Sequence, residues 1–216
     1  FGEYIAAHAN GGILANSIVS SSILKKIATH HKMEFRETLT GFKWLAKIKG
    51  LTFGYEEALG YCVDPTSVND KDGISAALVL AQIASDLKAE GKTILDFLDE
   101  IWLRHGFHGT EQISLRVNDL SQIATLLKSL RSDPPTEIAG REVISIDDLM
   151  QPKDGLPPTD GIRIWLVGEI RIIIRPSGTE AKVKCYIEVI SHAGASAAQE
   201  VLDQLRGPLT AFLTGS

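Results

Sequence analysis

The chain has 216 residues, of which 44% are hydrophobic and 23% are charged, and its formal net charge is −5. This length suits one large or two modest domains, and the hydrophobic fraction is ordinary for a globular protein with buried cores. The negative charge argues against nucleic-acid binding over a broad surface, because such binding depends on a basic face. No apolar run approaches the ~20 residues of a transmembrane helix, so we expect no membrane partner.

Two cysteines, Cys62 and Cys185, stand far apart in the chain and show no metal-ligand spacing. We interpret them as free thiols in a reducing compartment, the cytoplasm. The chain begins Phe1-Gly2, without an initiator methionine or a visible signal peptide. This start indicates a fragment or a trimmed chain.

The first part of the sequence alternates short strands with helices. We expect a helix end at 3–8, strands at 16–20, 33–39 and 51–55, and helices that begin near residues 23, 42, 73 and 94. His30 and His31 fall at the end of the helix that starts near residue 23. Because no further ligand is near them in the sequence, the pair favours a solvated helix end over a metal site.

Thr40-Gly41 follows the second predicted strand and opens a helix that we expect to run to Gly50. A strand-turn-helix junction directs backbone N–H groups at whatever lies above it. Lys43 falls in the first turn, where the helix dipole does not favour a cation. This placement indicates a binding role for Lys43 rather than an ordinary surface lysine.

Two adjacent carboxylates, Glu56 and Glu57, follow the predicted strand 51–55. The carboxyl edge of a sheet is a common place for ligand loops, and one carboxylate accepts hydrogen bonds from two neighbouring sugar hydroxyls. Taken alone, solvated loop charge explains this pair equally well.

Asp70-Lys71-Asp72-Gly73 precedes a long predicted helix, and Asp72 suits its N-cap. We place its apolar face at Ile74, Ala77, Leu78, Ala81, Ala84 and Leu87. Lys71 is either a neutralising cation in a capped turn or a charge beside the same sheet edge as Glu56.

The pattern changes near Gly109, which divides the chain into predicted domains 1–109 and 110–216. In the second domain we expect strands at 112–117, 137–146, 162–167, 170–174 and 183–189, a helix capped by Asn118, and a last helix that ends at Gly207-Pro208. Two helices on one face of an antiparallel sheet form an α+β sandwich. The overall class is therefore α/β, with a mixed α/β domain followed by an α+β domain.

The hexapeptide 175–180 joins two of these strands and reads Arg-Pro-Ser-Gly-Thr-Glu. The Arg175 guanidinium fits phosphate oxygens two at a time. Ser177 and Thr179 add hydroxyl donors, and Gly178 lets backbone N–H groups approach an anion. From these residues alone, a phosphate loop and an ordinary polar turn are equally open.

This turn resembles the phosphate-binding loop in the last domain of the α-D-phosphohexomutases, the family of phosphoglucomutases and phosphomannomutases. Three further stretches, 40–44 (Thr-Gly-Phe-Lys-Trp), 56–61 (Glu-Glu-Ala-Leu-Gly-Tyr) and 70–73 (Asp-Lys-Asp-Gly), resemble other motifs of the family in the same order. The form of 56–61 is most similar to the branch of phosphoglucomutases and phosphopentomutases. Ala58 departs from the serine of many members, and Ala181 departs from the proline that is commoner there.

The resemblance implies the fold and the roles of the site residues. The chain would be the third and fourth of four domains, the last one similar to the TATA-box-binding protein in fold. Glu56, with Glu57 and Gly41, would bind the sugar. The phosphate that is not transferred would be held by Arg175, Ser177, Gly178 and Thr179, and Lys71 and Lys43 would act beside the transferring phosphoryl group.

The resemblance also implies an isomerase, which interconverts sugar 1-phosphates and 6-phosphates through a phosphoserine and a sugar 1,6-bisphosphate. The serine loop and the aspartate-rich Mg²⁺ loop would belong to missing N-terminal domains, because the chain has no Asp-x-Asp-x-Asp run. We therefore expect no metal ligand in this part and no activity from it alone. A phosphopentomutase, a non-catalytic sugar-phosphate binding module and a phosphatase with its own nucleophile remain alternatives.

Overall fold

The structure is a computed structural model that describes residues 1–117, 119–153 and 155–214, without the side chain of Leu120. It forms two compact units, Phe1–His105 and Gly106–Ser216. The expected boundary at residue 109 lies inside the first strand of the second unit. Each unit has its own hydrophobic core.

The first unit is built on a four-stranded sheet with the order β2-β1-β3-β4. Its strands are β1 (Ile13–Ser17), β2 (Glu34–Thr38), β3 (Leu51–Glu56) and β4 (Gly60–Cys62). The central strand β1 is parallel to both β2 and β3, whereas β4 pairs with β3 as an antiparallel hairpin. The carboxyl ends of β1, β2 and β3 therefore meet at one edge of the sheet.

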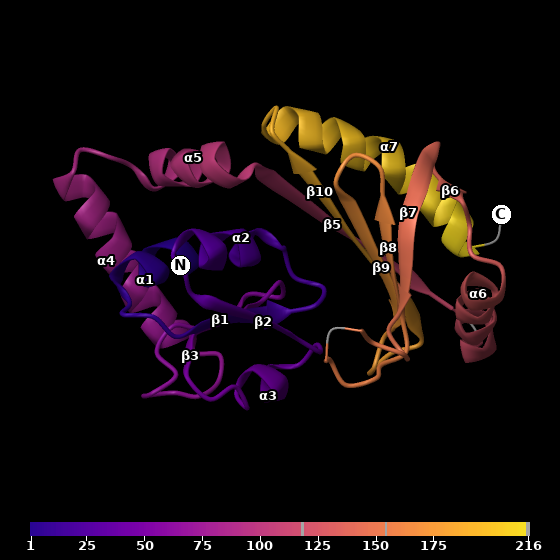
Figure 1. Cartoon of the computed structure of the whole chain (residues 1–216), viewed down its shortest axis with the longest axis horizontal. Coiled ribbons are helices and arrows are strands. Elements are labelled where there is room, and N and C mark those ends of the chain that lie inside the picture. The colour runs from indigo at the N-terminus through magenta and orange to yellow at the C-terminus, as the bar shows by residue number, and fades with distance from the viewer. Residues whose placement is uncertain (118, 154, 215–216) are drawn as a thin grey trace. The chain divides into compact units, whose positions relative to one another are not determined.

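Helices cover both faces of this sheet. They are α1 (Gly2–His8), α2 (Ile23–His30), α3 (Phe42–Leu45), α4 (Gly73–Ala89) and α5 (Ile94–His105). Alternate residues of β1 point to opposite faces: Leu14 packs in the core cluster of α1 and α2, and Ala15 packs against α3. Figure 1 shows α2 and α3 on opposite sides of the sheet.

Two predictions for these helices are wrong. The helix after Gly41 ends at Leu45, after a single turn, instead of continuing to Gly50. The predicted apolar face of α4 is also wrong in part, because Ile74 and Leu78 are 78% and 70% exposed and the buried residues are Ala76, Ile83 and Leu87. Since α4 is apolar on more than one side, periodicity alone does not choose the side that meets the core.

The second unit contains a six-stranded antiparallel sheet with the order β5-β10-β9-β8-β7-β6. Its strands are β5 (Phe107–Arg116), β6 (Glu137–Ile138), β7 (Arg141–Asp148), β8 (Ile162–Leu166), β9 (Ile170–Pro176) and β10 (Lys182–Ser191). The expected strand at 137–146 is thus two strands, joined by a turn in which Ala139 and Gly140 have φ angles of 53° and 74°. Left-handed residues of this kind end one strand and start the next.

Two helices, α6 (Leu120–Ser132) and α7 (Ala195–Thr214), share one hydrophobic core with the sheet. Ile170, Ile172 and Ile174 alternate along β9 into this core, because successive side chains of a strand point to opposite faces. Helix α7 lies along β5 and β10 (Figure 1). The expected α+β arrangement, two helices with an antiparallel sheet, is confirmed.

The expected end of the last helix is wrong, because α7 continues through Gly207 and Pro208 to Thr214. Leu209 and Leu213 are buried on the same side of α7 as Leu202 and Leu205, so their packing holds the helix together beyond the proline. The predicted cap Asn118 lies outside the described residues. Asp119 caps α6, and its side chain accepts a hydrogen bond from the Ser121 backbone N–H at 2.9 Å.

The face of the sheet opposite to these helices carries a buried charged group of three. Glu188 on β10 pairs with Arg171 on β9 at 2.9 Å and with His108 on β5 at 3.0 Å. All three side chains are at most 4% exposed. Arg171, Ile173 and Arg175 alternate along β9, so Arg175 belongs to this polar face and not to the helix-covered one.

None of the described helices combines the length and the apolar composition of a membrane span.

Candidate functional site

The first candidate loops lie at the carboxyl edge of the parallel strands in the first unit. Ser17 at the end of β1 pairs with Thr38 at the end of β2, and Asn16 pairs with Tyr55 near the end of β3. Gly41 follows β2 and Glu56 ends β3, so this register brings the two predicted loops to one edge. Such an edge is where ligands bind in α/β sheets.

Glu56 and Gly41 contact one another directly. The Glu56 carboxylate oxygen Oε1 accepts a hydrogen bond from the Gly41 backbone N–H at 2.5 Å. Gly41 has a φ angle of 107°, a left-handed conformation that favours glycine. The bond links two motifs that are fifteen positions apart and fixes one oxygen of Glu56.

Glu57 has a different environment. Its oxygen Oε2 accepts hydrogen bonds from the Ser20 and Ser17 hydroxyls at 3.2 and 3.4 Å, and its backbone N–H donates to Ser20 Oγ at 3.1 Å. No motif in the sequence marks Ser17 or Ser20 as part of the site. Ser20 begins the run Ser20-Ser21-Ser22, whose composition suits a helix cap equally well.

Lys71 lies over the neighbouring hairpin. Gly60 pairs with Glu56 across β3 and β4. A Cβ atom placed on Gly60 would lie 3.3 Å from Lys71 Cδ and 3.4 Å from the ring of Phe42. The aliphatic stem of Lys71 therefore crosses the strand position next to Glu56. Lys71 as a whole is exposed. Glycine at position 60 makes this close approach possible.

Asp72 follows Lys71 and caps the next helix. The Asp72 carboxylate accepts hydrogen bonds from the Ile74 and Ser75 N–H groups at 3.1 and 3.0 Å, which confirms the predicted N-cap of α4. A hydrogen bond from the Ser75 side chain, together with these two backbone hydrogen bonds, lowers the pKa of Asp72. Asp72 is therefore ionised at neutral pH and partly balances the Lys71 charge.

Lys43 is exposed on the single-turn helix α3. Its Nζ atom lies 5.8 Å from the centre of the Trp44 ring, and Lys47 Nζ lies 4.5 Å from the same ring. Because α3 has only four residues, the argument from a full helix dipole does not apply to Lys43. Lys43 remains a candidate through its place next to Gly41.

The second candidate loop joins β9 to β10 in the second unit. Pro176 pairs with Val183, and the Ser177 N–H donates to the Lys182 carbonyl at 2.8 Å, which closes the loop at its base. Between these anchors Gly178 is exposed, and no other atom lies within 4 Å of a Cβ placed on it. Thr179 is exposed beside it. The tip of the loop therefore presents its backbone openly.

Arg175 stands at the base of this loop and is partly buried. Its guanidinium carbon lies 5.9 Å from the centre of the Tyr186 ring, and its Nη1 atom donates to the Pro176 carbonyl at 3.1 Å. The buried Nε atom has no hydrogen-bond partner among the described residues. A buried N–H donor without a partner is costly unless a ligand or water satisfies it, so the base of the loop fits an anion.

Tyr186 also contributes to the site, although no sequence motif includes it. It lies on β10 opposite Ile173 and shares the face of Arg175. Its alternation with buried aliphatic residues predicts a core aromatic, and only the strand register brings its ring to the guanidinium.

Glu180 lies in the same loop and is held by Lys182 Nζ at 2.9 Å. This hydrogen bond lowers the pKa of Glu180.

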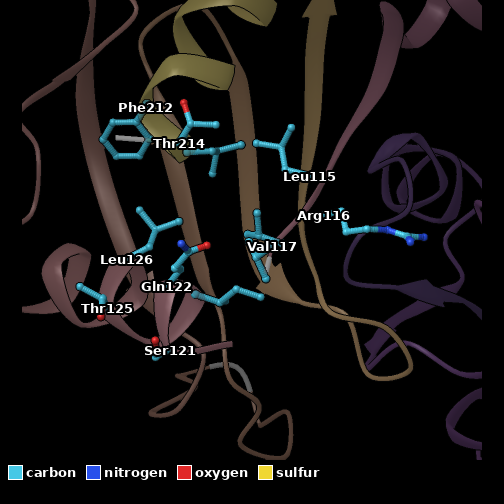
Figure 2. A pocket seen from close by; sticks show the side chains of 12 residues that line it. Leu115, Arg116, Val117, Ser121, Gln122, Thr125, Leu126, Phe212 and Thr214 are labelled. Carbon is cyan, nitrogen blue, oxygen red and sulfur yellow. The ribbon is translucent and has the colours of Figure 1, made fainter. Parts of the chain in front are cut away.

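The second unit also has a pocket of about 450 Å³ at the open end of α6 and α7. Figure 2 shows Leu115, Val117, Leu126 and Phe212 around it, and Arg116 extending away from it. The pocket opens on the helix-covered face, which carries Val183, whereas Arg175 is on the other face. It lacks an inward charge among its described lining residues, so we do not assign it to the phosphate.

Neither cysteine suits a nucleophilic role. Cys62 and Cys185 are free and buried. Burial raises the pKa of Cys62 to about 11 and that of Cys185 to about 12, whereas a nucleophilic cysteine must be a thiolate. The structure therefore gives no support to the phosphatase alternative through a thiol.

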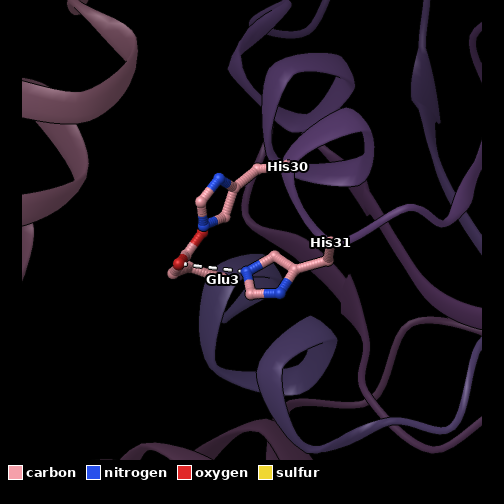
Figure 3. Close-up of side chains that lie close together, drawn as sticks. All are labelled: Glu3, His30 and His31. Carbon is pink, nitrogen blue, oxygen red and sulfur yellow. Dashed lines mark hydrogen bonds and ion pairs between the residues drawn. The ribbon is translucent and has the colours of Figure 1, made fainter.

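Among the described residues, one group of side chains has the arrangement of metal ligands: Glu3, His30 and His31 (Figure 3). Two imidazoles and one carboxylate do not fit Mg²⁺, which prefers six oxygen ligands. This group is also formed by helix ends, away from the loops that follow β2 and β3. We therefore derive no Mg²⁺-dependent step from the residues of this chain.

Comparison with known proteins places this fold and these loops in one family. The chain aligns with parafusin, a phosphoglucomutase from Paramecium solved in an open form, with a TM-score of 0.73, 22% identity and coverage of 100% of this chain and 42% of that one. Residues 1–105 match the model for the phosphoglucomutase/phosphomannomutase alpha/beta/alpha domain III, and residues 115–205 match the model for the C-terminal domain of the same family.

Two curated relatives agree with these matches. A Haemophilus influenzae protein named "Probable phosphomannomutase" is 46% identical over 190 residues, which cover 87% of this chain and 38% of the relative. A Staphylococcus epidermidis phosphoglucomutase is 33% identical over an alignment of 221 positions, gaps included. This match covers 89% of this chain and 39% of the relative. The chain belongs to the phosphoglucomutase/phosphomannomutase family and spans about two fifths of the length of these relatives.

Proposed function

We propose that this chain is the substrate-binding part of an isomerase that interconverts sugar 1-phosphates and sugar 6-phosphates. The observation that carries the proposal is the meeting of three separate motifs at one sheet edge. Gly41 donates to Glu56, and Lys71 crosses Gly60 beside Glu56. A carboxylate for sugar hydroxyls and a lysine for a phosphoryl group thus come from adjoining strand positions.

In this proposal, Glu56 reads the sugar with its second carboxylate oxygen, since Gly41 occupies the first. Glu57 supports the loop through Ser17 and Ser20 and contributes a further acceptor. Lys71 and Lys43 offset the negative charge that develops on the transferring phosphoryl group. Lys71 has the larger part, because its stem is held over the hairpin of Glu56.

The phosphate that is not transferred is assigned to the loop between β9 and β10. Arg175 binds it through the guanidinium, whose buried Nε lacks a partner among the described residues. Ser177, Gly178 and Thr179 add hydroxyl and backbone donors around it. A single grip of this kind lets the sugar bind in either of two orientations, which a mutase requires.

The phosphoryl transfer itself needs groups that we assign to the rest of the protein. A phosphoserine there gives its phosphoryl group to the free hydroxyl of the substrate, and the sugar 1,6-bisphosphate returns its other phosphoryl group to the serine. Mg²⁺ supplies charge neutralisation when it is bound by the N-terminal domains. The relatives are more than twice as long as the matched region, which leaves room for these domains.

The outer face of α4 supports a partner within the same protein. Ile74 and Leu78 are 78% and 70% exposed and stand one turn apart, and Leu59 in the sugar loop is 80% exposed. Large apolar side chains exposed together mark an interaction surface. We propose that the missing N-terminal domains cover Ile74 and Leu78 and complete the site beside Lys71.

A substrate panel on the full-length cytoplasmic enzyme tests this function. We expect phosphoryl isomerisation of glucose 1-phosphate or mannose 1-phosphate, with pentose 1-phosphate as the competing outcome that would define a phosphopentomutase. The 216-residue chain alone should show no turnover but should bind sugar phosphate. Robust conversion by the isolated chain would contradict the proposed division of labour. Absence of turnover by the full-length protein on all three sugars would favour a binding module.

A further inference from the structure

A second candidate site lies in the first unit, where the ends of three helices meet. Glu3 comes from α1, His30 and His31 from the end of α2, and His105 from the end of α5. Figure 3 shows the Glu3 carboxylate between the rings of His30 and His31. One donor atom from each of these three residues lies within 4.8 Å of the others.

The contacts of Glu3 leave one of its oxygens unused. Oε1 accepts from Arg104 Nη1 at 2.5 Å and lies 3.1 Å from His31 Nε2. Oε2 is buried without a hydrogen-bond partner among the described residues, and the same holds for His105 Nε2, which lies 3.9 Å from it. The side chains of Glu3 and His105 are each 7% exposed.

Buried polar atoms without partners need an explanation, and an unobserved ion is one of the usual ones. Here the two unsatisfied atoms are a carboxylate oxygen and an imidazole nitrogen, which are both good ligands for a transition metal. The His30 ring lies at 5.7 Å from the His105 ring and 4.9 Å from the His31 ring, measured between centroids. All four candidate donors therefore surround the same small volume.

We propose that Glu3, His30 and His31 form a binding site for a divalent transition metal ion of the Zn²⁺ type, with His105 as a fourth donor within reach. Tetrahedral Zn²⁺ with bonds of 2.0–2.2 Å places its ligand atoms about 3.4 Å apart. The donors are at most 4.8 Å apart, so small side-chain rotations close the site. His30 is exposed, which gives the ion a path from solvent.

The donor atoms select the kind of ion. Glu3 supplies one negative charge, whereas Arg104 and Lys26 lie nearby as cations, and Lys26 donates to the His105 carbonyl at 2.9 Å. Ca²⁺ and Mg²⁺ depend on several oxygen ligands, whereas this donor set combines one carboxylate with imidazoles. Imidazole-rich sites instead bind Zn²⁺, Ni²⁺ or Cu²⁺.

Metal binding would add a further link between α1, α2 and α5, which already share a core cluster with Ala6, Leu24 and Ile101 and the ion pairs of Glu3. Two histidines next to each other were weak evidence for a metal in the sequence. The structure adds Glu3 from the start of the chain and His105 from a distant helix. This inference is independent of the proposed mutase function.

Titration of the untagged, chelator-treated chain with ZnCl₂ tests the site, with MgCl₂ as the comparison ion. We expect a saturable isotherm with one Zn²⁺ per chain and a higher melting temperature, and no response to Mg²⁺. His30→Ala should reduce Zn²⁺ affinity by at least about tenfold, and it should fold normally because His30 is exposed.

The matched control is His192→Ala, an exposed histidine of the second unit that pairs with Glu169, and its Zn²⁺ affinity should equal that of the parent chain. Co²⁺ provides a second measurement, because it absorbs visible light in a site of low coordination number. This absorption should be present in the parent chain and in His192→Ala, and it should be lost in His30→Ala. Absence of saturable Zn²⁺ binding, or equal loss in both histidine variants, would overturn the proposal and leave a purely structural ion-pair cluster.

Discussion

The two candidate loops are built on opposite principles. In the first unit, Gly41, Glu56, Gly60 and Lys71 contact one another across separate strands, so the loops are positioned before any ligand arrives. In the second unit, the loop between β9 and β10 is anchored near its ends, by the bond from Ser177 to Lys182, by Arg175 beside Tyr186 and by Glu180 with Lys182. Its tip, with Gly178 and Thr179, is exposed.

The difference matches the two kinds of recognition that we propose. Discrimination between sugar hydroxyls needs acceptors in fixed positions, and a preorganised loop supplies them at low entropic cost. A phosphate presents equivalent oxygens in several directions, so an open turn with a charged base is sufficient. Each of the following substitutions tests one side of this comparison.

The largest effect on binding should follow from Arg175→Ala. The proposed guanidinium fork makes two charge-assisted hydrogen bonds to phosphate, at about 1.5 kcal/mol or more each, so sugar-phosphate affinity should fall about a hundredfold. Affinity for the unphosphorylated sugar should hardly change. Calorimetry with both ligands measures the difference.

Arg206→Ala is the control for Arg175→Ala, because Arg206 is an exposed arginine of the same unit that pairs with Glu111. It should leave both affinities intact. Equal losses for the phosphorylated and unphosphorylated sugar in Arg175→Ala would remove the phosphate role from this loop.

In the full-length enzyme, Lys71→Met should lower kcat by about tenfold to a hundredfold with little change in KM. Methionine keeps an unbranched stem over Gly60 and removes only the charge. Lys43→Met should have a smaller effect because α3 is a single turn, and Lys47→Met, on the same Trp44 ring, should have none. Steady-state kinetics on the three variants measures these effects. A kcat for Lys47→Met as low as that for Lys71→Met would contradict the assignment.

Glu56→Gln should weaken sugar binding by about tenfold, since it keeps an acceptor for Gly41 but loses the charge that strengthens hydrogen bonds from hydroxyls. Glu57→Gln should have a smaller effect, because Ser17 and Ser20 already use its Oε2. Calorimetry should show no loss for Glu34→Gln, an exposed glutamate of β2. A larger loss for Glu57→Gln than for Glu56→Gln would reverse the roles of the pair.

The smallest effects should come from two glycines, and they should differ in kind. Gly60→Ala places a methyl group 3.3 Å from Lys71 and 3.4 Å from Phe42, so it should cost about 1 kcal/mol of stability and reduce activity. Gly178→Ala meets no other atom within 4 Å, so its melting temperature should stay near that of the parent. Thermal unfolding of the two variants compares the preorganised loop with the open one. A lower melting temperature for Gly178→Ala would show that position 178 is packed against other atoms.

Local patterns were sufficient for much of the fold. The cap of α4 by Asp72 is an interaction within a few residues, and residue type and spacing predict it. The reciprocal bonds between Thr93 and Asp96 at the start of α5 are local in the same way. The strands at 170–174 and 183–189 follow from runs of apolar residues in the same way. The candidate motifs themselves were visible because each is contiguous in the chain.

The sequence by itself determined most of the element order, the Asp72 cap of α4 and the motifs, because each depends on residues that are close in the chain. Only the tertiary structure decided that α3 stops after one turn, that α7 continues through Pro208, and which face of α4 is buried. It also decided the partners of the site: Gly41 for Glu56, Ser20 for Glu57, Tyr186 for Arg175, and Glu3 for His31. These depend on strand register and helix packing, which bring together side chains that no local pattern relates.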